Sequence, residues 1–106
     1  MKQKEILTII SSSGESKGKA FEALTCVKKG EFTEARKKLA QARQLDIEAH
    51  KLQTELISQS LAEGHENDVD LLMVHAQDHY MTSQLARDLI EVLIDTFEAI
   101  SKKEER

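Results

Sequence analysis

The stretch LLMVHAQDHYMTSQLARDLIEVLIDTFEAI, residues 71–100, decides the fold of this chain. At 100° per residue, its positions 71, 75, 78, 82, 85, 89, 93, 96 and 100 lie within about 40° of a common line, as on one face of a long α-helix. Five of these nine residues are leucine or isoleucine, but His75 and Asp78 also lie on the line. We therefore predict a helix over about residues 69–103.

A first helix is predicted over about residues 3–29, where apolar residues recur at helical spacing. Lys28-Lys29-Gly30 is a suitable helix end, because cations meet the negative end of the helix dipole and glycine accepts a left-handed cap. The run Ser11-Ser12-Ser13-Gly14 consists of weak helix formers. We expect a bend or fraying there, or two helical pieces in register.

A second helix is predicted over about residues 32–63, with an apolar seam typical of packing against other helices. The seam consists of Ala42, Leu45, Ala49, Leu52 and Leu56. A polar turn follows at 64–68, with Asn67 or Asp68 as the expected N-cap of the third helix. Long helices joined by short turns predict an all-α fold, an antiparallel three-helix bundle running up-down-up, within one domain over 1–106.

The composition excludes several functional classes. The net charge of -4 argues against binding to a nucleic-acid backbone, which needs a basic surface. The single cysteine, Cys26, excludes an internal disulfide, and we expect it to be a packed thiol. The apolar run at 6–10 is far shorter than the ~20 residues of a membrane span. Without a recognisable signal peptide, we expect a cytoplasmic protein.

The third helix has more apolar residues than one bundle face requires. Additional apolar side chains flank its central line, and they are Leu72, Val74, Met81, Ile90, Val92 and Phe97. A bundle of this length leaves such a face partly exposed. We therefore expect the chain to form a homo-oligomer through this helix.

The candidate chemistry lies at His75, Asp78 and His79, which share one helix face at spacings i, i+3 and i+4. A lone histidine on an apolar face is often a satisfied core residue, whereas a carboxylate there needs a partner or a cation. The set could hold a divalent metal, or one imidazole could be a covalent nucleophile. Ala76 stands where a zinc-protease motif needs glutamate, and 14–20 falls one residue short of a phosphate-binding loop.

Two further histidines are weaker candidates. His50 lies on the second predicted helix, where we expect it to be polar surface. His65 lies in the predicted turn and is expected to be exposed to solvent.

Several segments of the chain resemble one protein family. Residues 74–82, VHAQDHYMT, are similar to the VHAQDHLMT signature of the lactose/cellobiose-type (N,N'-diacetylchitobiose-type) enzyme IIA of the bacterial sugar phosphotransferase system. Residues 49–57, AHKLQTELI, resemble the AHxxQTELI segment of that family, and 29–35, KGEFTEA, resemble its KGDFxxA turn. Residues 13–24 are similar to its first helix, so the resemblance covers nearly the whole chain in order.

This resemblance implies a nine-helix homotrimer and a phosphoryl relay. His75 would take a phosphoryl group from the phosphocarrier protein HPr on Nε2 and pass it to a cysteine of enzyme IIB, which works with the membrane component IIC. Gln77 and His79 would position the phosphate. Asp78 of each of three subunits would meet at the three-fold axis around a shared divalent cation, magnesium. The sugar would be a disaccharide of the lactose, cellobiose or chitobiose type.

The chain departs from the family pattern at two places. Tyr80 replaces the usual leucine, which could put a hydroxyl group near the site, and the segment 58–65 differs from the commoner sequence. The second departure bears on the sugar or partner and not on the chemistry. The alternative function is a non-catalytic, metal-assembled trimeric scaffold, in which Asp78 holds the assembly and His75 and His79 are metal ligands or core polar groups.

Overall fold

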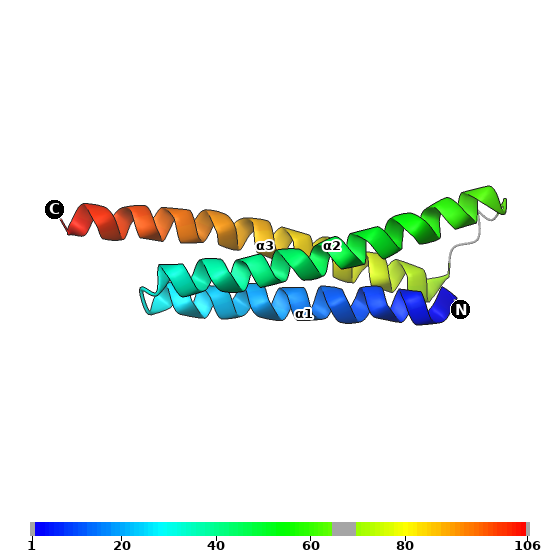
Figure 1. The fold of residues 1–106 in the computed structure, drawn as a ribbon, viewed down its shortest axis with the longest axis horizontal. Helices are drawn as coiled ribbons and strands as arrows, with labels where there is room; N and C mark the ends of the chain where they lie inside the picture. The colour runs from blue at the N-terminus through cyan, green and yellow to red at the C-terminus, as the bar shows by residue number, and fades with distance from the viewer. Residues whose placement is uncertain (1, 65–69, 106) are drawn as a thin grey trace.

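The computed structural model describes residues 2–64 and 70–105, and these residues form three α-helices. The helices are α1 (Lys2–Lys28), α2 (Phe32–Ala62) and α3 (Leu71–Glu104). They run up, down and up in a rod that measures 62 × 18 × 18 Å (Figure 1). The prediction of an all-α, antiparallel three-helix bundle is confirmed.

The turn between α1 and α2 closes on Gly30, as the sequence indicated. Gly30 has a φ of +74°, in the left-handed region that glycine adopts without strain. Its N–H donates to the Val27 carbonyl at 3.0 Å, and the N–H of Glu31 donates to the Cys26 carbonyl at 2.9 Å. These two bonds form a Schellman cap, which satisfies carbonyl groups at the end of α1.

Helix α1 is continuous through the serine run, so the expected bend or break is absent. Ser13 and Ser16 are both fully buried, and Ser16 Oγ donates to the Ala42 carbonyl of α2 at 2.8 Å. Small side chains at these positions let the other helices approach closely. Tertiary packing therefore outweighs the weak helix propensity of serine, which costs only a few tenths of a kcal/mol per residue (~0.5 relative to alanine).

The core is built largely from small residues. One cluster lies near the α1–α2 turn and includes Ala20, Ala23, Ala35, Ala42 and Ile94, all fully buried. A second cluster lies towards the start of α1 and includes Ile9, Ala49 and Ala76. Because alanine projects little beyond the backbone, helices packed through it come close together.

The seam between α2 and α3 is polar along most of its length. Hydrogen bonds and ion pairs join side chains of α2 to side chains of α3 at successive positions. The pairs are Gln53–Gln77, His50–Tyr80, Asp46–Ser83, Asp46–Arg87, Arg43–Glu91, Arg36–Asp95 and Arg36–Glu98. Helices α2 and α3 both pack mainly against α1, and hydrogen bonds and ion pairs hold α2 against α3.

Helix α3 turns its predicted apolar line away from the bundle. Ala76, Ser83, Ile90 and Ile94 face the core, whereas Leu71, Leu85 and Leu89 are more than half exposed. Ile90, which we expected on a flank of the outer line, is instead buried in the core. The periodicity correctly identified an apolar face, but that face is open in the protomer and is not the core-facing one.

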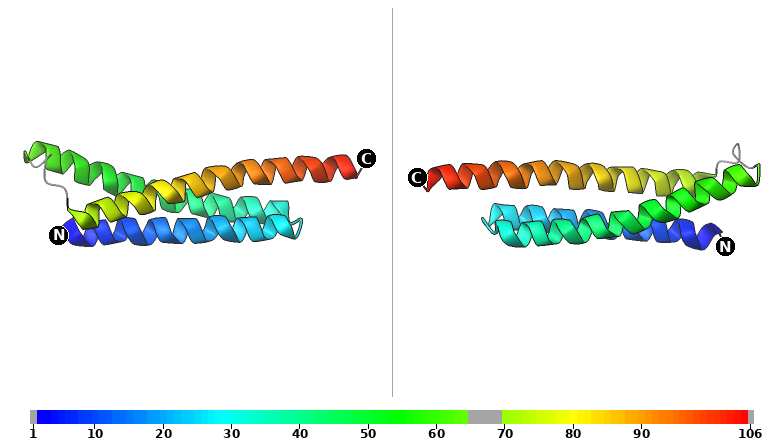
Figure 2. Two further views of the ribbon diagram at one scale, coloured as in Figure 1. Left: turned by 180° about the vertical axis from the view of Figure 1, so that it is seen from behind. Right: turned by 45° about the horizontal axis from the view of Figure 1, so that its top comes forward.

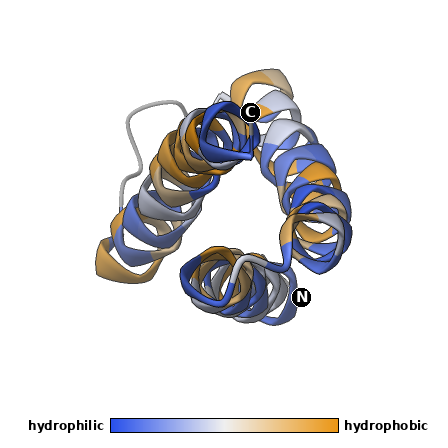
Figure 3. Ribbon diagram, turned by 90° about the vertical axis from the view of Figure 1, so that its left-hand side faces the viewer, coloured by the Kyte–Doolittle hydropathy of each residue, from blue (hydrophilic) through white to orange (hydrophobic). Residues whose placement is uncertain are grey.

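Ile100, at the end of this line, is also exposed. The other exposed apolar residues of α3 lie beside the line, and they are Val74, Met81, Val92 and Phe97. The C-terminal end of α3 also extends past the α1–α2 turn, while the C-terminal end of α2 diverges from α1 (Figure 2). Seen along the rod, hydrophobic residues recur along α3 up to its hydrophilic C-terminal end (Figure 3).

Helix α3 is capped at its N-terminus by Asp70. Its carboxylate accepts a hydrogen bond from the Met73 N–H at 2.8 Å, which satisfies one of the free donors of the first turn. The expected caps Asn67 and Asp68 lie outside the described residues, and the structure gives this role to Asp70 instead.

Candidate functional site

Two imidazoles meet on the first third of α3. His75 is exposed and His79, one helical turn later, is half-buried. Their Nε2 atoms lie 3.1 Å apart, and the ring planes are perpendicular with centroids 4.5 Å apart. Hydrogen bonding between two such nitrogens requires one to carry a proton and the other a lone pair. The pair can therefore present one nucleophilic Nε2 beside one Nε2–H donor.

Asp78 lies on the outer face of α3 and does not join the two histidines. Its side chain is exposed, and its backbone carbonyl accepts a hydrogen bond from Thr82 Oγ1 at 2.9 Å. Within residues 2–64 and 70–105, no three histidine, cysteine or carboxylate side chains are placed to hold a metal ion together. The three-ligand set His75, Asp78 and His79, one of the alternatives open from the sequence, is thus not formed within one chain.

Gln77 faces a different side of the helix from His75. Two residues correspond to about 200° of rotation, and the amide of Gln77 accepts a hydrogen bond from Gln53 Nε2 of α2. Gln53 is buried at this position. Gln77 also lines a hollow of about 290 Å³ together with Ile57, Met73, Val74 and Asp78. Within one protomer, the structure therefore places Gln77 beside α2 and His79 beside His75.

Tyr80 reaches the second helix and not the two histidines. Its hydroxyl group lies 3.1 Å from Nδ1 of His50, and the two rings stack with centroids 5.8 Å apart. Burial raises the pKa of Tyr80, and the negative charge of Asp46 adds to this. His50 is exposed as expected, but it has a definite partner across the α2–α3 seam.

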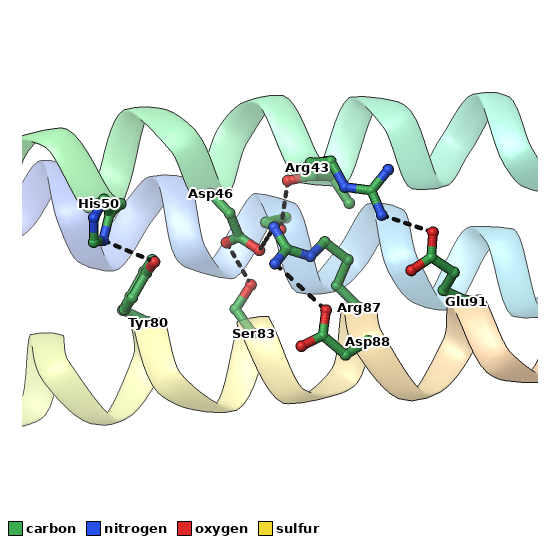
Figure 4. Close-up of polar contacts among 10 residues, drawn as sticks. Arg43, Asp46, His50, Tyr80, Ser83, Arg87, Asp88 and Glu91 are labelled. Carbon is green, nitrogen blue, oxygen red and sulfur yellow. Dashed lines mark hydrogen bonds and ion pairs between the residues drawn. The ribbon is translucent and has the colours of Figure 1, made fainter.

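A buried charge lies next to this pair. Asp46 is 1% exposed and accepts a hydrogen bond from Ser83 Oγ at 2.9 Å, while Arg87 Nη1 lies 3.3 Å from its other oxygen (Figure 4). Asp46, His50, Tyr80 and Arg87 line one cavity of about 290 Å³. The network neutralises a carboxylate that would otherwise be costly to bury.

Sequence reasoning missed this network. Asp46 lies on the same buried line of α2 as Ala42 and Ala49, so a carboxylate at core spacing was the available signal. Its partner Ser83 is 37 positions away, and no local pattern joins the two.

Two other candidates, Cys26 and the segment 14–20, carry no site in the described part of the chain. Cys26 is a free, half-buried thiol, which fits the expectation of a packed residue. The glycine-containing segment 14–20 is a regular part of α1 and forms no loop that could cradle a phosphate. His65 lies outside the described residues.

Known proteins resemble this chain in both sequence and fold. The family "PTS system, Lactose/Cellobiose specific IIA subunit" matches residues 4–98. The chain is 41% identical over 98 residues to the lichenan-specific phosphotransferase enzyme IIA component of Bacillus subtilis, covering 92% of this chain and 88% of that one. It is 42% identical over 95 residues to the N,N'-diacetylchitobiose-specific EIIA component of Escherichia coli K12, covering 90% and 81%.

Solved structures agree with these matches. The cellobiose-specific enzyme IIA from Bacillus anthracis superimposes with a TM-score of 0.88 at 34% identity, over 97% of this chain and 94% of that one. The IIA(Chitobiose) of Escherichia coli, determined in complex with HPr, superimposes with a TM-score of 0.84 at 38% identity, over 95% and 97%.

Among the described helices, none is long and apolar enough to cross a membrane. The match spans almost all of the chain, and it includes the helix that carries His75, Asp78 and His79. The chain therefore belongs to the lactose/cellobiose-specific IIA family and is an enzyme IIA component of the sugar phosphotransferase system.

Proposed function

We propose that His75 is the phosphoryl acceptor and donor of this enzyme IIA. The observation that carries the proposal is the His75–His79 pair, in which an exposed imidazole presents Nε2 beside a second Nε2 at 3.1 Å. The phosphoryl group would come from phosphorylated HPr and go to a cysteine of the cognate enzyme IIB, which acts with the membrane component IIC. The structure of the related IIA(Chitobiose) with HPr supports this choice of donor.

The transfer needs a lone pair on His75 Nε2. In the tautomer that provides it, His75 carries its proton on Nδ1 and His79 donates its Nε2–H to His75 Nε2. When phospho-HPr docks, the hydrogen bond from His79 to His75 breaks. The lone pair on His75 Nε2 then attacks the phosphorus in line with the bond to the donor histidine. The P–N bond to the donor histidine breaks, and its electron pair stays on that imidazole. The donor ring takes up one proton from solvent, which balances the proton that His75 Nδ1 releases.

His79 has a second use after the transfer. Its Nε2–H, no longer bonded to a lone pair on His75, can donate to a phosphoryl oxygen and stabilise the added negative charge. The neutral hydrogen bond is thus replaced by a charge-assisted one. Passing the group to a thiolate of enzyme IIB restores the original pair.

Gln77 belongs to this proposal as a second phosphate-positioning residue, but in a different place from His79. Because it faces away from His75 in its own protomer, it can reach a phosphohistidine only across a contact between subunits. Its bond to the buried Gln53 holds its carbonyl oxygen towards α2, which leaves its NH₂ group free to donate.

The outer face of α3 supports assembly as a homotrimer. Residues 71, 75, 78, 82, 85, 89, 92 and 96 follow alternating steps of four and three, which is the spacing of a coiled-coil seam. Most of the apolar residues on this seam are about half exposed or more in the protomer. Association of three α3 helices through this seam would give nine helices around one axis.

Asp78 fits a cation site on the axis of such a trimer. In the described part of the chain no basic side chain pairs with it, and exposed Leu85 and Leu71 lie on the same seam. Three carboxylates brought together among leucines would repel one another unless a cation neutralised them. Carboxylate oxygens are the ligands that Mg²⁺ prefers, so Asp78 of each subunit would hold it.

The transported sugar is proposed to be a disaccharide of the lactose, cellobiose or chitobiose type, since relatives specific for cellobiose and N,N'-diacetylchitobiose are 42–44% identical to this chain.

Intact-mass spectrometry tests the relay directly. The protein is incubated with phosphoenolpyruvate, enzyme I and HPr, and we expect one added phosphoryl group per chain that is lost in acid. His75→Ala should abolish the addition, whereas His50→Gln, which removes a histidine from the α2–α3 seam, should not. A His75→Ala chain that still gained the group would refute the assignment.

The alternative scaffold function makes the opposite pair of expectations. If the protein were only a metal-assembled scaffold, wild type would gain no phosphoryl group, and His75→Ala would dissociate the oligomer. Sedimentation of the same two samples therefore separates the two functions.

A further inference from the structure

We propose that His75 and His79 form a chelating site for a transition-metal dication such as Zn²⁺, separate from Asp78. The phosphoryl relay uses the lone pair of only one Nε2 of this pair, whereas a chelated metal would be bound by both nitrogens. The two Nε2 atoms lie close together on one side of α3, and His75 is exposed in the protomer.

The distance between the two nitrogens fits chelation. Zinc binds imidazole nitrogen at about 2.0–2.1 Å, so two nitrogens on one metal lie about 2.8–3.4 Å apart for angles between about 90° and 109°. The observed Nε2–Nε2 distance is 3.1 Å. A metal could therefore replace the hydrogen bond between the rings without a change of the helix.

Chelation requires a lone pair on both nitrogens. The ring that carries its proton on Nε2 must change to the Nδ1–H tautomer, which moves one proton within that ring through water and releases none from the neutral pair. Two protein ligands leave the other coordination positions to water. The site is thus an open one, unlike a closed structural site with four protein ligands.

The donor set selects the kind of ion. Imidazole suits Zn²⁺, Ni²⁺ and Cu²⁺, whereas Mg²⁺ prefers oxygen ligands and keeps its waters. No carboxylate joins the pair in the described part of the chain. Mg²⁺ is therefore a negative control for this site, although we assign it to Asp78.

Metal binding and phosphorylation exclude each other at His75, an effect that rests on the proposed function. A bound metal occupies the Nε2 lone pair that attacks phosphorus, so the loaded protein cannot accept the group. Transition-metal ions are then competitive inhibitors of phosphoryl transfer. A chelator restores the transfer.

Isothermal titration of the unphosphorylated protein with Zn²⁺ tests the site without any phosphoryl chemistry. We expect one Zn²⁺ per chain, and a loss of affinity of about tenfold or more in His79→Ala, since even the loss of an outer-shell partner costs about that much. His75→Ala should lose as much, and His50→Gln should bind as wild type does. Equal Zn²⁺ affinity in His79→Ala and wild type would overturn the proposal.

A second measurement separates this proposal from the relay. Purified phospho-HPr is added to the protein with and without saturating Zn²⁺, and the added mass is followed over time. Transfer that is blocked by Zn²⁺ and restored by EDTA is the expected result. Transfer at an unchanged rate to Zn²⁺-saturated protein would refute the claim that bound metal blocks phosphorylation of His75. No transfer in the absence of Zn²⁺ would refute the relay, but the result of the titration would still stand.

Discussion

Replacing Arg87 by methionine removes the positive charge beside a buried carboxylate. Asp46 is 1% exposed, and only the Ser83 hydroxyl at 2.9 Å and Arg87 at 3.3 Å compensate its charge in the described structure. Methionine keeps most of the aliphatic stem that packs at position 87, so the substitution isolates the loss of charge.

The expected cost is about 3 kcal/mol. Breaking a buried ion pair by removing one partner costs about 3–5 kcal/mol, because the other charge stays buried. The lower end applies here, since the Arg87 side chain is 14% exposed and Asp46 keeps its bond to Ser83. At a urea dependence of about 2 kcal/mol per molar, the unfolding midpoint falls by about 1.5 M.

Urea unfolding followed by circular dichroism measures this loss, and one protein concentration is used for all variants so that any association contributes equally. The matched control is Arg43→Met, which breaks the exposed pair with Glu91 and should cost less than about 1 kcal/mol. Replacing both Asp46 and Arg87 by apolar residues should recover much of the loss. An Arg87→Met variant no less stable than Arg43→Met would refute the role given to the buried pair.

Three further outcomes are expected. If the protein forms the proposed metal-centred trimer, EDTA should dissociate the wild type. The Asp78→Leu variant should remain trimeric in EDTA, because the repulsion between the three carboxylates is gone. A wild-type sedimentation coefficient that EDTA leaves unchanged contradicts this. The hydrogen bond from Arg36 lowers the pKa of Glu98 from 4.5, so its contribution to stability is present above that pH and disappears as the pH falls through the lowered value. The free energy of unfolding of Glu98→Gln should therefore change less than that of wild type between neutral pH and pH 3. Equal changes in the two proteins would argue against a stabilising Arg36–Glu98 pair. Gly30→Ala should destabilise the fold by about 1 kcal/mol through its left-handed φ, whereas Gly18→Ala, inside α1 with open space at its Cβ, should be neutral or stabilising in the same melt.

The sequence was sufficient for most of the architecture. The periodicity of 71–100, the glycine at position 30 and the lengths between them predict three long helices, and the structure has them within one or two residues of the expected bounds. These features are local, because hydrogen bonding, capping and the apolar spacing of a helix act within a few residues. The motif around His75 was likewise visible as a conflict between apolar spacing and polar residue types.

The sequence alone did not determine which face of α3 is buried. The core-facing and the exposed rows of side chains on α3 have the same helical period. Only packing against α1 places Ala76 and Ile90 inward and His75 and Asp78 outward. The partners of Asp46 and Gln77 were also decided by tertiary structure, since α2 meets α3 across long separations in the chain. Periodicity reports how residues are spaced on one helix, but which stripe is covered depends on the volume of the side chains that the neighbouring helices present.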